Sequence, residues 1–498
     1  MKMVKSLLLG GAAGLVTVAG AQAADLPVKA KPVEYVKICS LYGDGFYYIP
    51  GTETCLRIGA SAQADYFYGS LANGHILFDG AGGAHDRTVS EHAMRGRGDI
   101  GLDSRTQTAY GTLRSVVVLR MDNVDGGTVT PNVPRAFIQW AGFTFGHTKS
   151  YSDPFGSFGG GELRNITQGI THDDTGANGT NQIAYTWDLG NGMVVVVGAD
   201  ERKNNSLSNL STAGVVAVGS APTTSRAGML FPDPYAVFRM SQAWGNFSAA
   251  IHASQNSALY YTGNNAVLGL TGCGVGAQAG TTQCLYPSDK MGWALLTGGQ
   301  INLPWIAQGD RVLGFFNYGQ GATKYAGGAN LNSAGLFGSG NVVALGVATD
   351  GVYVNGAGIQ LTTGWAFGAA FEHWITPQFD IVVYGSRGEF KYNNTVIAGR
   401  YFCGGSGAAV QNIVVAATTV CDPGFTYSEV GLRFDWYPVP AFRLAIEARY
   451  AMIDTAFAGQ VTLTKTQGAR PTGAYTAKDQ GISQVAFRAQ RGFGGIGE

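Results

Sequence analysis

The sequence predicts an all-β fold, a transmembrane antiparallel up-and-down β-barrel. The most informative segment is Glu429–Tyr450, where two runs of alternating residues flank a proline-containing turn. Because successive side chains of a strand point to opposite faces, this hairpin has one apolar face and one face carrying both signs of charge. In addition, short turns and long connections alternate along the chain. Together these patterns indicate a wall between lipid and a water-filled lumen.

Length and composition are compatible with this fold. The chain has 498 residues, including 75 glycines, and only 13% of its residues are charged. Beyond the first 23 residues it contains no run of roughly 20 apolar residues, as a membrane helix would require. Lysine plus arginine (33) balance aspartate plus glutamate (33). The sequence therefore offers no basic field for nucleic acid, and we expect no nucleic-acid partner.

The first 23 residues are predicted to be a secretory signal peptide. Lys2 and Lys5 precede an apolar core at Ser6–Gly20, and Ala21-Gln22-Ala23 supplies a small-x-small cleavage site. A membrane anchor is the alternative, but the apolar run is short and rich in glycine. We therefore expect residues 24–498 to form the mature protein.

The mature chain shows no linker that would divide it, so a single barrel is expected. Its predicted parts are an N-terminal stapled segment (24–54), barrel strands with their loops (55–493) and a C-terminal extension (494–498). Besides the hairpin, strand-like runs are predicted at Cys55–Tyr68, Ala93–Asp103, Thr112–Met121, Arg135–His147, Asn181–Asp188, Met193–Asp200, Tyr235–Ala243, Phe247–Ser254, Met291–Gln300, Arg311–Tyr318, Gly364–His373, Phe379–Tyr384 and Ile482–Phe493.

Six cysteines occur as three pairs that are local in sequence. Six cysteines allow fifteen pairings, of which local pairing is the simplest. An exported chain meets an oxidising compartment, so structural disulfides are expected rather than a metal or redox site. Closing each loop would stabilise the fold by roughly 3 kcal/mol in the chain-entropy model. The predicted pairs are Cys39 with Cys55, Cys273 with Cys284, and Cys403 with Cys421.

Three segments resemble the alphaproteobacterial, rhizobial-type general porin family. They are PVEYVKICSLYGDGFYYIPGTETCLRIGA from Pro32, RAFIQWAGFTFGHTKSYSD from Arg135, and VAFRAQRGF, which ends at Phe493. The resemblance implies a barrel of about sixteen strands, assembled as a homotrimer in the outer membrane of a Gram-negative bacterium. It also implies contact with outer-membrane lipid and lipopolysaccharide, and passage of ions and small hydrophilic solutes. This sequence departs from the family pattern at its C-terminus. Such porins usually end on an aromatic residue, which here is Phe493, whereas Gly494–Glu498 follow it.

General porins narrow their lumen with a long loop that folds inward. The corresponding candidate is Thr148–Gly179, which is too long for a hairpin connection. Its acidic residues would face a basic strip of the barrel wall. A solvated external loop is the alternative interpretation. The predicted constriction acids are Asp153, Glu162, Asp173 and Asp174.

The basic strip is predicted on the first strands, where arginines share a parity opposite to apolar residues such as Met94 and Leu119. A charged side chain that faces lipid at the midplane costs roughly 2–4 kcal/mol, so these arginines should face the lumen. Opposite loop carboxylates they would create a transverse field. Alternatively, they only line the lumen and pair with nearby acids. The predicted residues are Arg57, Arg95, Arg97, Arg114, Arg120 and Arg135.

The sequence gives little support for other chemistry. The seven histidines are scattered, and neither a His-Glu-x-x-His motif nor a Gly-x-Ser-x-Gly motif occurs. Gly159–Gly161 lacks the Lys-Ser/Thr of a phosphate loop. We therefore predict a passive channel with no catalytic residues, metal or cofactor. An adhesin or structural barrel with a filled lumen, or a barrel enzyme, remain the alternatives.

Overall fold

A computed structural model describes most of the chain. The described residues are 37–69, 83–153, 179–201, 206–209, 226–258, 288–328, 333–354, 357–400, 402, 413–415, 418–463, 466 and 468–495. The predicted signal peptide, Cys273, Cys284, Cys403, Glu162, Asp173 and Asp174 lie outside them.

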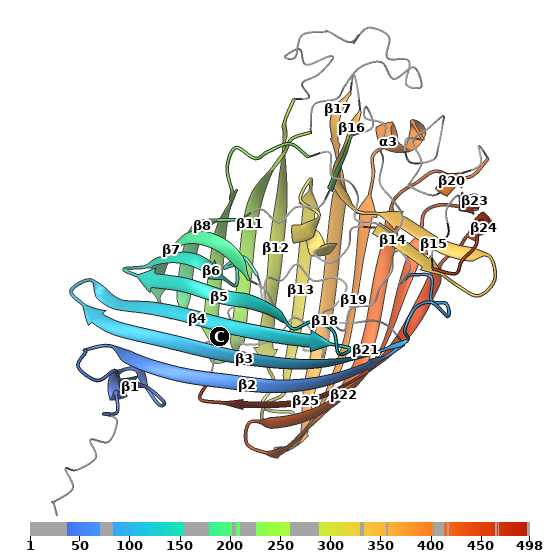
Figure 1. Ribbon diagram of the computed structural model, residues 1–498. Helices are drawn as coiled ribbons and strands as arrows, with labels where there is room; N and C mark the ends of the chain where they lie inside the picture. Colours follow the sequence, from blue (N-terminus) through green and yellow to red (C-terminus); the bar gives the residue numbers. More distant parts are fainter. Residues whose placement is uncertain are drawn as a thin grey trace, which may run out of the picture.

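Sixteen antiparallel strands form a closed barrel, in which each strand pairs with its neighbours along the chain (Figure 1). Pairing of the first barrel strand with the last closes the cylinder. The barrel strands are β2 (Cys55–Tyr68), β3 (His92–Thr108), β4 (Gly111–Val124), β5 (Thr130–Trp140), β6 (Phe143–Thr148), β7 (Thr180–Gly190), β8 (Met193–Asp200), β10 (Asp233–Gln242), β11 (Gly245–Asn256), β12 (Lys290–Asn302), β13 (Arg311–Gln320), β18 (Thr363–Thr376), β19 (Phe379–Lys391), β21 (Phe425–Val439), β22 (Phe442–Thr455) and β25 (Gln480–Phe493).

The connections differ in length between the two ends of the barrel. At the short-turn end, turns of two to eight residues join consecutive strands, and β2 begins and β25 ends there. At the long-loop end, connections of five to 42 residues join them. This asymmetry is typical of outer-membrane barrels, whose short turns are periplasmic and whose longer loops are extracellular. The predicted fold class is confirmed.

One predicted strand is wrong. Arg135–His147 was expected as a single run, but it forms the hairpin β5–β6. Ala141 and Gly142 take positive φ angles of 51° and 87° and reverse the chain. Paired positive φ angles are the geometry of two-residue hairpin turns, and here an alanine occupies a position that usually holds Asn, Asp or Gly. The turn therefore had a weak sequence signal.

The outer surface of the barrel is apolar, as the alternation predicts. Met94, Ile100 and Leu119 are each 46–60% exposed although they lie within strands. Aromatic side chains gather at the short-turn end, where Phe379 and Trp436 stack with ring centroids 5.8 Å apart. Aromatic girdles of this kind mark the membrane interface of β-barrels. Among the described residues, no helix is long and apolar enough to cross a membrane.

The long loops contain structure of their own. A five-stranded sheet combines β14 (Ser333–Phe337), β15 (Val342–Val347), β20 (Ile413–Val415), β23 (Gly459–Leu463) and β24 (Gly473–Ala477). A three-stranded sheet combines β9 (Ser206–Asn209), β16 (Thr349–Val354) and β17 (Gly358–Leu361). Two short helices, η4 (Lys324–Gly328) and α3 (Asn394–Ala398), complete this end. The five-stranded sheet stands at one side of the barrel mouth in Figure 1.

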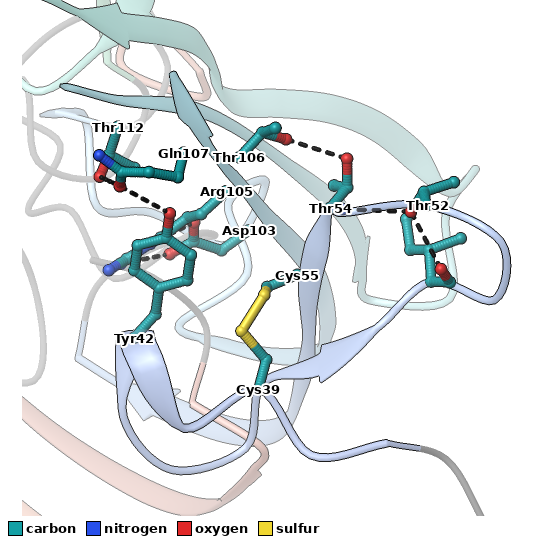
Figure 2. The surroundings of a disulfide bond; sticks show 11 residues. Cys39, Tyr42, Thr52, Thr54, Cys55, Asp103, Arg105, Thr106, Gln107 and Thr112 are labelled. Carbon is teal, nitrogen blue, oxygen red and sulfur yellow. Dashed lines mark hydrogen bonds and ion pairs between the residues drawn. A yellow bond between two sulfur atoms is a disulfide. The ribbon is translucent and has the colours of Figure 1, made fainter. Parts of the chain in front are cut away.

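The N-terminal segment is stapled to the barrel as predicted. A disulfide joins Cys39 to Cys55, and the two Cα atoms are 6.0 Å apart (Figure 2). The segment contains the one-turn helix η1 (Ser40–Tyr42) and the short strand β1 (Tyr47–Tyr48), which pairs with the first residues of β2. Cys421 is also disulfide-bonded.

Candidate pore lumen

Seven adjacent strands, β21, β22, β25 and β2–β5, carry most of the inward-facing charge of the barrel strands; we call their inner surface the charged wall. It holds eleven arginines and seven carboxylates. The arginines are Arg57, Arg95, Arg97, Arg105, Arg114, Arg120, Arg135, Arg433, Arg443, Arg449 and Arg488. The carboxylates are Asp65, Asp99, Asp103, Asp122, Glu429, Asp435 and Glu447.

Asp103 on β3 is the centre of one ion-pair cluster in this wall. Its carboxylate accepts hydrogen bonds from Arg105 Nη2 at 2.9 Å and Arg114 Nη2 at 3.0 Å. Arg57 Nη2 lies 3.4 Å from Asp103 Oδ2. The three arginine side chains keep 21–24% of their surface exposed, whereas Asp103 keeps 2%. The cluster therefore presents guanidinium groups to the lumen and buries the carboxylate beneath them.

The other predicted arginines also lie on the inner face. Arg95 pairs with Asp65 at 2.5 Å, Arg97 with Asp122 at 2.6 Å, and Arg120 with Asp99 at 2.7 Å. Arg135 is buried and donates a hydrogen bond to the carbonyl oxygen of Pro134. Five of the six predicted arginines thus pair with carboxylates of the same wall, which is the alternative considered from the sequence. Their effect on selectivity stays a prediction.

Sequence reasoning left the C-terminal half of the charged wall out of the predicted site. Arg433 and Arg443 both bind Asp435, at 2.6 Å and 2.8 Å. Arg449 binds Glu429 at 3.2 Å, and both side chains are fully buried. The signal was present, because these residues form the charged face of the hairpin Glu429–Tyr450. What the sequence did not show is that barrel closure brings them beside β2.

The opposite part of the inner surface, formed by β7, β8, β10–β13 and β18, is mainly apolar; we call it the apolar wall. One cluster of buried residues runs along β7–β12, with Val196, Val237 and Leu296 among its members. A second cluster includes Leu313, Phe315 and Ala370. These side chains face inward but are shielded from water.

The first residues of the candidate constriction loop fold onto the apolar wall. Tyr151 packs against the cluster on β7–β12. Its hydroxyl shares hydrogen bonds with Thr144 Oγ1 at 2.8 Å and Gln139 Nε2 at 3.1 Å. Ser150 Oγ donates to Asp200 Oδ2 at 2.5 Å. The chain therefore turns into the barrel as it leaves β6.

Arg239 on β10 holds this segment. Its guanidinium donates to the carbonyl oxygens of Tyr151 and Asp153, the latter at 3.2 Å, and lies 5.4 Å from the centroid of the Tyr151 ring. Asp153 itself is only 1% exposed. Its burial beside Arg239 is typical of an anchoring residue, and its predicted role as a constriction acid stays a prediction.

A cavity of about 580 Å³ adjoins the charged wall. Arg120, Arg135, Lys149 and Asp99 line it, together with Gly492–Gly495. Gly494 and Gly495 take φ angles of 71° and 63°, and a Cβ on Gly494 would lie 2.2 Å from the carbonyl oxygen of Ile58. Only glycine permits this close approach, so the residues after Phe493 begin by turning along the inner face of β2.

A closed antiparallel barrel with an apolar outer band and a charged inner wall defines the class of outer-membrane β-barrels. The family described as "Porin subfamily" matches residues 25–485. The chain belongs to this porin family, which confirms the resemblance seen in the sequence. Family membership places the protein in the outer membrane.

Individual relatives agree with this assignment. The chain is 30% identical over 267 residues to porin Omp2b of Brucella suis, a match covering 50% of this chain and 65% of the relative. It is 33% identical over 227 residues to porin Omp2a of Brucella canis, covering 40% and 56%. The matches thus cover less than two thirds of either relative. The outer membrane channel DcaP of Acinetobacter baumannii has a similar fold, with a TM-score of 0.53 and 13% identity over 90% of this chain and 99% of that one.

Proposed function

We propose that the protein forms a water-filled channel through which ions and small hydrophilic solutes diffuse across the outer membrane. The observation that carries this proposal is the charged wall. Partly exposed guanidinium groups on β2–β4 face inward, while the outer surface of the same strands is apolar. Such a wall needs water on its inner side, because ionised side chains are costly to bury in an apolar medium.

The composition of the charged wall supports a preference for anions. Eleven arginines against seven carboxylates leave an excess of four positive charges. Selectivity in a water-filled pore follows the charges at its narrowest point. We propose that the acidic residues predicted in Thr148–Gly179 face this wall and set the final balance, so that polar solutes align in a field across the lumen.

Assembly and partners complete the proposal. Residues 1–23 act as the signal peptide, and residues 24–498 form one barrel. A homotrimer surrounded by outer-membrane lipid and lipopolysaccharide follows from the resemblance to rhizobial-type general porins. The apolar outer band, with Ile100 and Leu119 exposed, supports the contact with lipid.

Liposome swelling with sugars of increasing size tests the proposed function. Purified protein reconstituted into liposomes should admit small sugars and exclude large ones. Liposomes that stay impermeable to every sugar, with the protein folded as a barrel, would contradict a diffusion channel. They would instead favour the alternative of a filled lumen, which the burial of the apolar wall makes worth testing.

A further inference from the structure

The N-terminal segment places two aromatic rings at the short-turn end of the charged wall. These rings belong to Tyr42 and Phe46, which we call the aromatic cap, and their centroids are 5.9 Å apart. Phe46 is only 2% exposed, although it precedes the first barrel strand. It forms a buried cluster with Cys39 and Cys55, against which Tyr42 packs. The aromatic cap is therefore packed against the barrel and does not extend freely from it.

The aromatic cap lies on the guanidinium groups of the Asp103 cluster. The guanidinium carbon of Arg105 is 4.7 Å from the centroid of the Phe46 ring, and that of Arg57 is 4.9 Å from it. The Arg105 guanidinium also lies 5.6 Å from the centroid of the Tyr42 ring (Figure 2). A guanidinium within about 6 Å of a ring centroid is attracted by the quadrupole of the ring. One phenylalanine thus holds two of the three arginines that pair with Asp103.

The disulfide fixes the aromatic cap at this position. Cys55 is the first residue of β2 and lies opposite Arg105 in the β2–β3 ladder. Its partner in the disulfide, Cys39, donates a backbone hydrogen bond to the carbonyl oxygen of Phe46 at 2.9 Å. The disulfide therefore holds the Phe46 ring beside the strands that carry its two arginines.

The arginines under the aromatic cap form an excess of positive charge at one mouth of the pore. Arg57 is two residues from the start of β2, and Arg105 is three residues from the end of β3, both at the short-turn end. Three arginines share the single carboxylate of Asp103, so the cluster has a net charge of +2. The Arg57 and Arg105 side chains keep 23% and 24% of their surface exposed.

A restraint on these two arginines affects the field at the mouth. Arginine side chains have many rotamers and like charges repel, so the exposed guanidinium groups would spread apart if nothing held them. The Phe46 ring keeps both groups in one place and adds an apolar surface behind them. Charges of one sign beside such a low-dielectric surface focus field lines into the adjoining water.

We propose that the aromatic cap determines the ion selectivity of the short-turn mouth, with Phe46 as the positioning residue that holds Arg57 and Arg105. This inference rests on the proposed channel function. Phe46 is buried and acts through the two guanidinium groups, whose exposed surface attracts small inorganic and organic anions. The disulfide between Cys39 and Cys55 belongs to the same arrangement, because it keeps the ring in place.

Phe46→Leu tests the proposal, because leucine retains an apolar side chain but offers no ring face to the guanidinium groups. The permeability ratio of anion to cation, taken from the reversal potential in a KCl gradient, should fall by roughly 1.5-fold. Phe46→Tyr restores a ring and should return the ratio to that of the wild type. Phe316→Leu is the matched control, since Phe316 is 45% exposed on the outer face of β13 and should leave the ratio unchanged.

The salt dependence of conductance separates an effect of charge from a change in pore width. The Debye length is about 10 Å at 0.1 M salt and about 3 Å at 1 M salt. Single-channel conductance of Phe46→Leu should therefore be below that of the wild type at the lower concentration and equal to it at the higher one. A conductance altered by the same factor at both concentrations would show a change in width and would overturn the proposal.

A permeability ratio equal to that of the wild type in folded Phe46→Leu would also overturn the proposal, as would a ratio that Phe46→Tyr does not restore. If Phe46→Leu fails to assemble, the double variant Cys39→Ser with Cys55→Ser releases the ring without removing it. That variant should lower the ratio too, and an unchanged ratio would contradict the proposal equally. Failure of the proposed function is distinguishable, because the wild-type protein would then conduct no ions.

Discussion

The charged wall and the apolar wall belong to one barrel but have different neighbours. On the charged wall, Arg57, Arg105 and Arg114 keep over a fifth of their side-chain surface exposed. On the apolar wall, Val196 and Leu296 are fully buried, and Tyr151 and Tyr325, from the inward segments that follow β6 and β13, pack against the same cluster. In these examples, an inward-facing residue is polar where it meets the lumen and apolar where an inward segment covers it. The comparison shows that the position of the inward segments decides which half of the barrel lines the pore.

The largest effect is expected when the segment that covers the apolar wall is released. Arg239→Ala removes the donor to the carbonyl oxygens of Tyr151 and Asp153. Buried carbonyl groups without partners cost about 1–3 kcal/mol each, so the segment should leave the wall. Single-channel conductance should then rise at least roughly twofold, as width controls flow. Arg387→Ala, on the outer face of β19, is the control. Equal conductance in both variants would show that Arg239 does not hold the constriction loop.

Charge reversal on the charged wall should alter selectivity rather than conductance. Arg114→Glu or Arg120→Glu changes the wall by two charges and leaves Asp103 or Asp99 facing a like charge. The reversal potential in a salt gradient should shift toward cations, with a permeability ratio changed roughly twofold or more. A reversal potential identical to that of the wild type would remove the mutated residue from the narrow region.

A smaller shift in the opposite direction is expected for Asp103→Asn. The variant removes one negative charge from beneath Arg57, Arg105 and Arg114 but keeps the side-chain volume. The anion preference should increase by less than the charge-reversal variants decrease it, because only one charge changes. A shift toward cations would contradict the arrangement of the cluster.

The smallest effect concerns the loops, away from both walls. Asp86 accepts hydrogen bonds from Thr88 and from the N–H of Ala469. Burial acts to raise its pKa, but these bonds, with Arg470 nearby, outweigh burial and hold the pKa below its ordinary value of 3.8. A carboxylate with a lowered pKa stabilises the contact above its unfolded pKa and loses that contribution as the pH falls through the folded pKa. The protection of the Ala469 N–H against hydrogen exchange, relative to its intrinsic rate at each pH, should therefore fall below about pH 4 in the wild type but not in Asp86→Asn.

Sequence reasoning predicted the charged wall better than the apolar wall, and the cause is physical. One face of the hairpin Glu429–Tyr450 meets lipid and the other meets charged side chains. Apolar and polar residues therefore alternate along both of its strands. Strand β8, by contrast, has apolar surroundings on both faces, and Val194–Val197 shows no alternation. Its existence could be predicted from the apolar run, but the inward direction of Val196 could not.

The attachments of the inward segments could not be predicted from sequence. Arg239 and Tyr151 are 88 residues apart, and Tyr427 and Gly327 are 100 residues apart. The five-stranded sheet could not be predicted for the same reason, because Val342 of β15 pairs with Thr476 of β24, which is distant in the sequence. Contacts of this kind depend on barrel closure, which brings distant strands together. The disulfide Cys39–Cys55, with a separation of 16 residues, was within reach of local reasoning.

The reversal potential of single wild-type channels in a salt gradient tests most directly the claim that the charged wall lines the pore. The excess of arginine predicts an open, ion-conducting pore whose reversal potential lies toward the equilibrium potential of the anion. A folded barrel that conducts no ions, or one that prefers cations, would contradict it.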